Sequence, residues 1–325
     1  MLTGMVAHQA GVSAAHDLWT RWNADPLIFL GLVLAAWAYH RGTRRRRQRN
    51  GSWRSRCFYG ALVAVGIAVL SPLDALAHEL ASAHMVQHVL LMVIAAPLVA
   101  VSAPVATMLA GAPPAVARAI GRTRRRLRFA AGAFEALRRP AVAWLLATGT
   151  LWFWHASGSY DAAVEHDAIH ALEHASLIVT GVLFWSAIVH VRRAPPTSYG
   201  YGALLVFTMA LQSVFLAALL TFATTPWYGV YRTTTSAWGI DPLVDQQLAG
   251  AIMWVPAGFV YVGVGVSLVA RWIRAPGSSM DLLDDDWGFG ADRGSSSAGH
   301  ARRDEDRGAD RVDHEHEIAL HSGAP

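Results

Sequence analysis

The sequence predicts an all-α, polytopic membrane protein with about seven transmembrane helices, and three observations lead to this prediction. Hydrophobic residues make up 54% of the 325 residues and charged residues only 15%, against about 25% charged residues in a typical soluble domain. The mean hydropathy is positive, at +0.30. The apolar residues also fall in long blocks, and blocks of roughly 20 residues match a bilayer core about 30 Å thick.

The apolar blocks define the predicted spans in chain order. Trp19 and Trp22 would anchor the outer end of the first span at the membrane interface. Pro97 and Pro104 should kink the third span, and Pro256 the seventh, because each proline removes a backbone hydrogen bond. The predicted membrane domain, residues 1–272, has spans at residues 27–40, 57–76, 84–110, 140–156, 168–189, 202–223 and 248–272.

Arginine positions set the predicted orientation. Eight arginines lie in residues 41–56 and eight more in residues 111–139, whereas the segments expected on the other side carry almost none. Because positive residues favour cytoplasmic loops, we expect the N-terminus outside and the C-terminus in the cytoplasm of a bacterial plasma (inner) membrane. The arginines lie between apolar blocks, and the sequence shows no motif for recognising nucleic acid. Both observations argue for the lipid bilayer, and against nucleic acid, as a partner. Residues 273–325 are charged and poor in large apolar side chains, which predicts a disordered cytoplasmic tail.

Six of the fifteen histidines are expected near the outer side: His84, His88, His155, His166, His170 and His174. His84 and His88 are one helical turn apart on the third span, and the last three repeat that step at the start of the fifth. Two facing ladders of imidazoles can offer nitrogens to one metal ion. Met92, one turn beyond His88, adds a soft ligand that favours copper(I). We therefore predict His84, His88, His170 and His174 as metal ligands, with His155 at the rim of an outward-facing, water-accessible pocket.

Polar residues near these histidines are predicted to orient them. Glu173 lies between His170 and His174, where a carboxylate can fix the tautomer of an imidazole. Asp245 and Gln246 begin the seventh span on the same side and would orient the ligands or attract a cation. The segment from His170 to His174 also matches the HxxEH pattern of inverted zinc peptidases. This match is short and no clear downstream acidic ligand follows it, so we do not expect an enzyme.

These residues resemble a known family, the CtaG-type assembly factors of bacterial caa-type cytochrome c oxidases. The resemblance lies in residues 84–97 (HMVQHVLLMVIAAP), in Trp154-His155 through Tyr160-Asp161 to the HALEH segment, and in residues 245–256 (DQQLAGAIMWVP). It implies a role in maturing the oxidase by helping copper reach it, with oxidase subunits as partners. The first two spans, the tail and the ASGS segment at residues 156–159 do not match the family pattern. The positions that carry the family's polar signature are His84, His88, His155, His170, His174, Asp245 and Gln246.

Three other functions stay open at this point. Paired histidines on neighbouring spans can ligate a b-type haem, which would give a Soret band. A copper or proton transporter would need polar residues continuing through the inner leaflet, and few follow Gln212. A purely structural partner without a metal would keep oxidase activity after His174→Ala.

Overall fold

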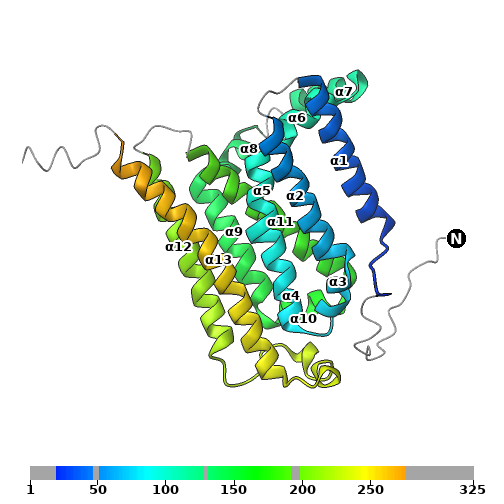
Figure 1. The fold of residues 1–325 in the computed structure, drawn as a ribbon, viewed down its shortest axis with the longest axis vertical. Coiled ribbons are helices and arrows are strands. Elements are labelled where there is room, and N and C mark those ends of the chain that lie inside the picture. Colours follow the sequence, from blue (N-terminus) through cyan, green and yellow to red (C-terminus); the bar gives the residue numbers. More distant parts are fainter. Residues whose placement is uncertain (1–19, 47–50, 127–130, 192–197, 276–325) are drawn as a thin grey trace, which may run out of the picture. The chain divides into compact units, whose positions relative to one another are not determined.

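The computed structural model describes residues 20–46, 51–126, 131–191 and 198–275. These residues form helices joined by turns, and no β-strand occurs among them (Figure 1). The prediction of an all-helical protein is therefore confirmed. Trp19 and all but the first three residues of the predicted tail lie outside the described residues.

Among the described residues, five helical spans are long and apolar enough to cross a membrane. The other two predicted spans fall short of this standard for different reasons. Helix α9 (Pro140–His155) has 16 residues, which at 1.5 Å per residue gives about 24 Å. Helix α1 (Pro26–Arg46) ends in a polar turn rich in arginine. The five spans are Trp53–Leu70, Ala81–Ser102, Asp167–Val191, Ser198–Thr221 and Pro242–Ile273.

The outer surfaces of two long helices suit a lipid environment. Helix α12 spans Ser198–Thr221 and helix α13 spans Pro242–Ile273. Soluble proteins rarely expose large contiguous apolar patches, yet large apolar side chains on these helices are more than half exposed. These side chains are Phe207, Leu211, Phe215, Phe259, Val262 and Val266.

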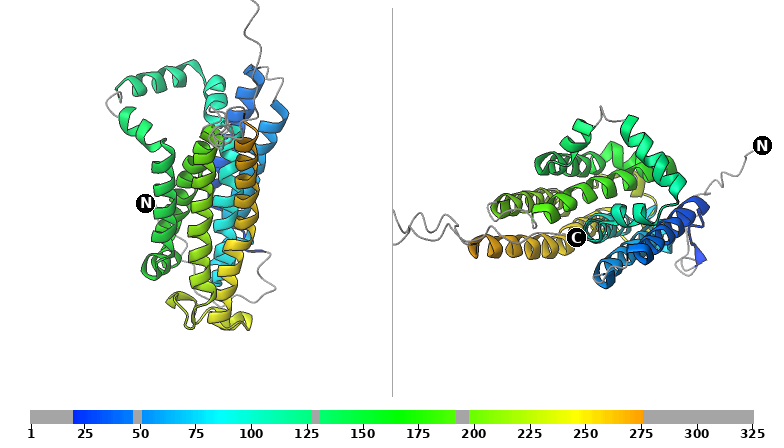
Figure 2. Two further views of the ribbon diagram at one scale, coloured as in Figure 1. Left: turned by 90° about the vertical axis from the view of Figure 1, so that its left-hand side faces the viewer. Right: turned by 90° about the horizontal axis from the view of Figure 1, so that it is seen from above.

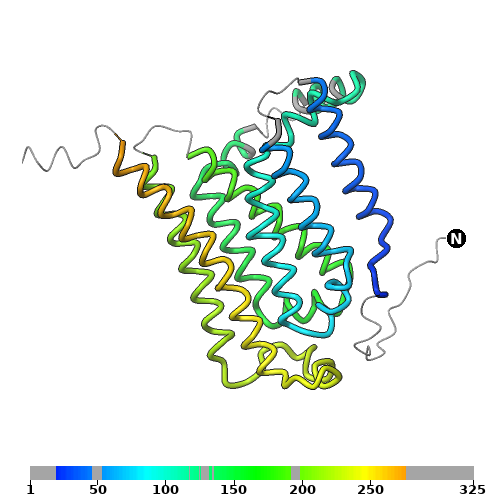
Figure 3. The backbone as a smooth tube through the Cα atoms, viewed as in Figure 1, coloured from blue at the N-terminus to red at the C-terminus, as the bar shows by residue number. Residues whose placement is uncertain are grey.

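The third predicted span, residues 84–110, is divided into four segments. Helix α4 (Ala81–His88) continues into the π-helix η2 (Val89–Ala95) and then α5 (Ala96–Ser102). Figure 3 traces this part of the backbone in cyan. Pro97 follows the π-helix and has no N–H to donate to the preceding turn, a usual setting for such a widened turn. The chain then breaks at Ala103, which has a left-handed φ of 47°, before α6 (Pro104–Gly111).

The second predicted span, residues 57–76, also divides. Helix α2 (Gly51–Leu70) ends before Ser71, whose side chain accepts a hydrogen bond from the Leu73 N–H. Ser71 thereby caps the short helix α3 (Pro72–Ala77), which begins with a proline at its first position. This N-cap chemistry favours a new helix over continuation of the old one.

The remaining helices complete the bundle and its two ends. The structure has α7 (Pro114–Arg126), α8 (Ala131–Leu137), α10 (Ser157–Glu165), α11 (Asp167–Val191) and the 3₁₀ turns η4 (Gly229–Tyr231) and η5 (Thr235–Trp238). Helix α11 packs against α9 and α5, and α4 packs against α13. Helices α3 and α10 lie at the end of the bundle where α4 and α11 begin (Figure 1). Helix α7 runs across the opposite end (Figure 2).

Candidate metal centre

Two helices bring four histidines together near one end of the bundle. His84 and His88 lie one turn apart on α4, and their Nε2 atoms are 2.9 Å apart. His170 and His174 lie one turn apart on α11, with ring centroids 4.2 Å apart. Between the helices, the ring centroid of His84 lies 5.1 Å from that of His170. The ring centroid of His88 lies 5.7 Å from that of His174, so the two ladders face each other.

Glu173 places a carboxylate beside both histidines of α4. Its Oε2 lies 3.2 Å from His84 Nε2, and its Oε1 lies 3.4 Å from His88 Nε2. The Glu173 side chain is fully buried. A buried carboxylate costs several kcal/mol unless a proton, an imidazolium or a metal ion accompanies it. The spacing argument placed Glu173 next to the histidines, and the structure puts it there.

The donor atoms of four residues lie close enough for one ion to draw them together. One donor atom from each lies within 4.8 Å of the other three. Four ligands about 2.1 Å from a tetrahedral ion would lie about 3.4 Å from one another, so the group would contract from separations of at most 4.8 Å on binding. The four residues are His84, His170, Glu173 and His174.

Several imidazole nitrogens of the cluster have a lone pair to offer. The Nε2 atoms of His155, His170 and His174 are buried and have no hydrogen-bond partner among the described residues. Buried polar atoms are otherwise almost always paired. Neutral imidazole is a common metal ligand, suited to copper and zinc, so the donor set fits a cation that prefers nitrogen.

His155 joins the cluster from α9. Its Nδ1 lies 2.8 Å from the Leu151 carbonyl oxygen, so Nδ1 carries the proton and Nε2 keeps the lone pair. The ring centroid of His155 lies 5.4 Å from that of His88. We predicted His155 at the rim of a pocket. The side chain is instead 2% exposed and lies inside the bundle, because the last turn of α9 packs beneath α10.

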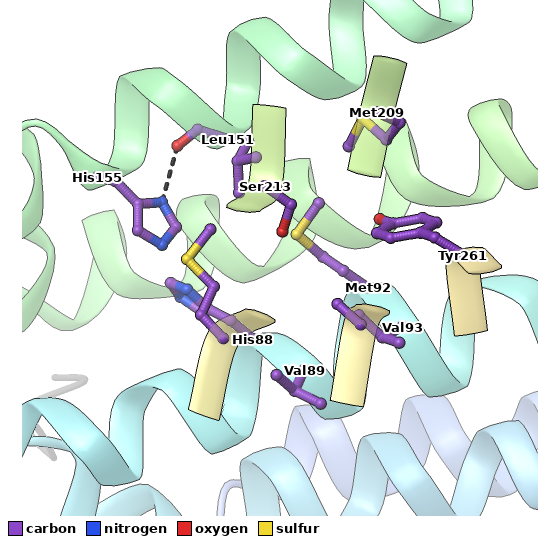
Figure 4. Close-up of a pocket in the computed structure, with 11 residues that line it drawn as sticks. His88, Val89, Met92, Val93, Leu151, His155, Met209, Ser213 and Tyr261 are labelled. Atoms are coloured by element: carbon purple, nitrogen blue, oxygen red, sulfur yellow. Dashed lines mark hydrogen bonds between the residues drawn. The ribbon is translucent and has the colours of Figure 1, made fainter. Parts of the chain in front are cut away.

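A cavity of about 30 Å³ adjoins His88 and His155 (Figure 4). This volume exceeds the space that one water molecule needs, so an ion or a water can occupy it. Three methionines line the cavity, one each from η2, α12 and α13: Met92, Met209 and Met253. Thioether sulfurs are soft ligands that select copper(I).

Three tyrosines cover the cluster from α10 and the segment that contains η4. Tyr231 donates its hydroxyl proton to the Ala77 carbonyl at 2.7 Å, and its oxygen lies 3.3 Å from His84 Nδ1. Because that proton is already used, the Tyr231 oxygen accepts from His84 Nδ1–H in the second contact, which helps to fix the orientation of the His84 ring. The ring of Tyr160 stacks on that of Tyr228 at 3.8 Å and lies 4.9 Å from that of His84. Burial raises the pKa of the Tyr160 and Tyr231 hydroxyls well above its usual value, so both stay neutral.

This cover corrects the expectation of a water-accessible pocket. The predicted ligands are at most 8% exposed: His84, His88, His155, His170 and His174. The sequence places imidazoles at the end of the bundle, but it does not show that α10 and the segment before α13 fold over them. The structure holds a closed cluster in place of an open pocket.

Asp245 and Gln246 have partners other than the histidines. Asp245 accepts hydrogen bonds from the backbone N–H groups of Ala81, at 2.6 Å, and Ser82, at 3.2 Å. It therefore caps the first turn of α4 from a neighbouring helix. Gln246 Oε1 accepts from the Trp227 N–H at 2.6 Å. We expected both side chains to orient the ligands or attract a cation; Asp245 instead fixes the start of the helix that carries His84.

Comparison with known families settles the kind of protein. A family model for the cytochrome c oxidase caa3 assembly factor matches residues 37–275. This range is well over half of the 325 residues and contains the whole histidine cluster. The chain belongs to this family. The resemblance drawn from the three motifs is thereby confirmed, and the family match extends to the second predicted span.

The chain is also similar to two curated proteins, an uncharacterised protein of Mycobacterium bovis and one of Mycobacterium tuberculosis. Each is 28% identical over 273 residues, which cover 78% of this chain and 40% of the relative. The chain therefore spans about two fifths of the length of these relatives. No solved structure matches it.

The structure brings two further residues to the cluster that were not among the predicted ligands. Asp74 on α3 and His78 after it offer donor atoms within 4.8 Å of His170. Their spacing of four residues, one helical turn, was the available signal. His166 behaves in the opposite way. It was grouped with the other five histidines, but it is exposed, and its Nδ1 contacts the Ala162 carbonyl at 3.2 Å.

Proposed function

We propose that this assembly factor holds a copper ion in transit to cytochrome c oxidase. The ligands would be drawn from His84, His88, His170 and His174, with His155 and Met92 beside them. One observation carries the proposal: imidazoles from three helices converge around one buried carboxylate, and several of their nitrogens have no hydrogen-bond partner among the described residues. Membership of an oxidase assembly family supplies the destination.

The choice of copper rests on the cavity beside the histidines. Zinc is bound by imidazole, thiolate and carboxylate ligands, and thioethers add little to its binding. Copper(I) accepts thioether sulfur, and three methionines line the cavity that His88 and His155 adjoin. A nitrogen-rich cluster next to a sulfur-lined cavity therefore favours copper over zinc.

The proposal includes an orientation in a bacterial plasma membrane. The histidine cluster lies at the end of the bundle marked by α3 and α10, and the arginine-rich helix α7 lies at the other end (Figure 1). Positive charge favours the cytoplasmic side. In the proposed orientation the cluster therefore lies toward the outside, with the N-terminus outside and the C-terminus inside. The partner would be an oxidase subunit that accepts its copper on that side.

A closed cluster suits a carrier better than a catalyst. The tyrosine cover shields the cluster on the side of α10 and the segment containing η4, so an ion reaches it from that side only if this cover moves. An assembly factor has to give up its metal, so we expect modest affinity and no turnover chemistry. A haem is a poor fit, because a cavity of about 30 Å³ is far below the roughly 300 Å³ or more of ligand pockets.

Genetic complementation tests the proposal. In cells lacking the chromosomal gene, the wild-type chain and His166→Ala should restore cytochrome c oxidase activity, because His166 lies outside the cluster. His174→Ala should not restore it at limiting copper, and excess copper in the medium should recover part of the loss. Full activity of the His174→Ala strain at limiting copper would rule out the metal role. A Soret band in the purified wild-type protein would favour haem instead.

A further inference from the structure

A second group of metal-ligating side chains adjoins the buried cluster. Asp74, His78 and His170 each offer a donor atom, and these atoms lie within 4.8 Å of one another. The ring centroids of His78 and His170 are 4.9 Å apart. Two imidazoles and one carboxylate are a known donor set for a divalent transition-metal ion, and imidazole also suits copper.

Both new side chains are held in place by neighbours, as metal ligands usually are. Asn23 donates to Asp74 Oδ2 at 2.8 Å, and Gln87 donates to Asp74 Oδ1 at 3.0 Å. His78 Nδ1 lies 3.1 Å from the Val164 carbonyl oxygen, so Nδ1 carries the proton and Nε2 keeps the lone pair. Such hydrogen bonds fix the orientation of a ligand before the metal arrives.

The two groups differ in their access to water. Asp74 and His78 are partly exposed, whereas His84 and Glu173 are 0% exposed. His170 belongs to both groups. A neutral imidazole has one lone-pair nitrogen, so His170 can serve one ion in one of the two groups at a time.

We propose that Asp74, His78 and His170 form an outer metal site that receives the ion and passes it inward by way of His170. In the transfer the ion leaves Asp74 and His78, stays on His170, and gains His84, His174 and Glu173. No bond other than metal–ligand bonds changes, and the metal keeps its oxidation state. The proposal rests on the proposed function in taking copper as the cargo.

Copper(I) uptake by the purified full-length protein in detergent tests this route, with a coloured copper(I) chelator as competitor. The double variant His84→Ala/His174→Ala dismantles the inner cluster but keeps the outer site, so it should still bind one copper(I), more weakly than the wild type. Adding His78→Ala to that variant should abolish the remaining binding. His166→Ala is the matched control and should bind like the wild type.

Uptake kinetics give a second, independent measurement. With the inner cluster intact, His78→Ala and Asp74→Asn should each leave one copper(I) bound at equilibrium but lose the fast phase of uptake. Far-UV circular dichroism and gel filtration show whether each variant is folded. An inner double variant that binds no copper(I), or a His78→Ala protein that loads as fast as the wild type, overturns the outer site alone. A wild-type protein that binds no copper(I) overturns the proposed function and the outer site with it.

Discussion

Glu173 is the residue on which the electrostatics of the cluster depend. It places both carboxylate oxygens within 3.4 Å of an imidazole nitrogen of α4 and lies one residue before His174 on α11. A cation held by neutral imidazoles alone would carry its full charge into the bundle. The Glu173 carboxylate offsets that charge where little solvent screens it.

Replacing this charge while keeping the shape tests its role. Glu173→Gln should weaken copper(I) binding by at least about tenfold, a typical effect of disturbing a group next to a metal. Glu165→Gln, at the exposed end of α10, is the matched control and should bind like the wild type. Competition with a coloured chelator measures both affinities. Equal affinity for Glu173→Gln and the wild type would show that the carboxylate does not face the ion.

The sequence predicts some of these residues better than others. The spacing of His84, His88, His170 and His174 puts pairs of imidazoles on single helix faces, and helical geometry alone then brings each pair together. The role of Asp245 could not be read in this way. A carboxylate at the start of a span suggests a charge for the site, but its partners are backbone N–H groups of α4, and only the packing of α13 on α4 reveals them.

At the scale of helices, hydropathy locates the long elements and misses their interruptions. The blocks at residues 168–189, 202–223 and 248–272 each correspond to one continuous helix. The block at residues 84–110 contains a π-helix and a left-handed break at Ala103. Apolar content is the same on both sides of such a break, so hydropathy carries no signal for it. Pro97 and Pro104 predict that this block is interrupted, but they do not predict a π-helix or a left-handed residue.

Helix packing makes a prediction at Gly250. A Cβ at this position on α13 would lie 2.8 Å from the Ala217 carbonyl oxygen of α12 and would clash with Thr221 Oγ1. Gly250→Ala should therefore separate α12 from α13 and destabilise the protein by about 1–3 kcal/mol, as overpacking usually does. The matched substitution Gly258→Ala, where a Cβ meets nothing within 4 Å, should be neutral or stabilising, since alanine favours helix.

Thermal unfolding in detergent, followed by circular dichroism at a helical wavelength, compares the two variants. The predicted order of melting temperature is Gly250→Ala below the wild type and Gly258→Ala at or above it. If the two variants melt together, the close approach of α12 and α13 at Gly250 does not contribute to stability.

Over the described part of the molecule, the arginine-rich and histidine-rich regions lie at opposite ends of the bundle. Arginines gather toward α7 and histidines toward α10, and the apolar helices between them separate the two ends. The order of the apolar blocks and the charge of the loops between them predict this separation. The closure of the cluster was not predictable, since it depends on how the segments containing α10 and η4 fold over the helix ends.

Cysteine labelling of intact cells tests the proposed orientation. The native Cys57 is buried and should stay unlabelled, so single introduced cysteines report their own position. Ser157→Cys, exposed at the start of α10, should react with a maleimide that cannot cross the inner membrane. Ala119→Cys, exposed on α7, should react only after the inner membrane is opened. The reverse pattern would place the histidine cluster in the cytoplasmic half.

X-ray absorption at the copper edge tests the central claim most directly, that the converging imidazoles hold a copper ion. The purified protein would be loaded with one equivalent of copper(I) and freed of unbound metal before measurement. We predict a first shell dominated by imidazole nitrogens, which give a characteristic outer-shell scattering pattern. That pattern should be lost in the His84→Ala/His174→Ala protein and kept in His166→Ala. Copper without imidazole scattering in the wild type, or a pattern unchanged by the double substitution, would contradict the assignment.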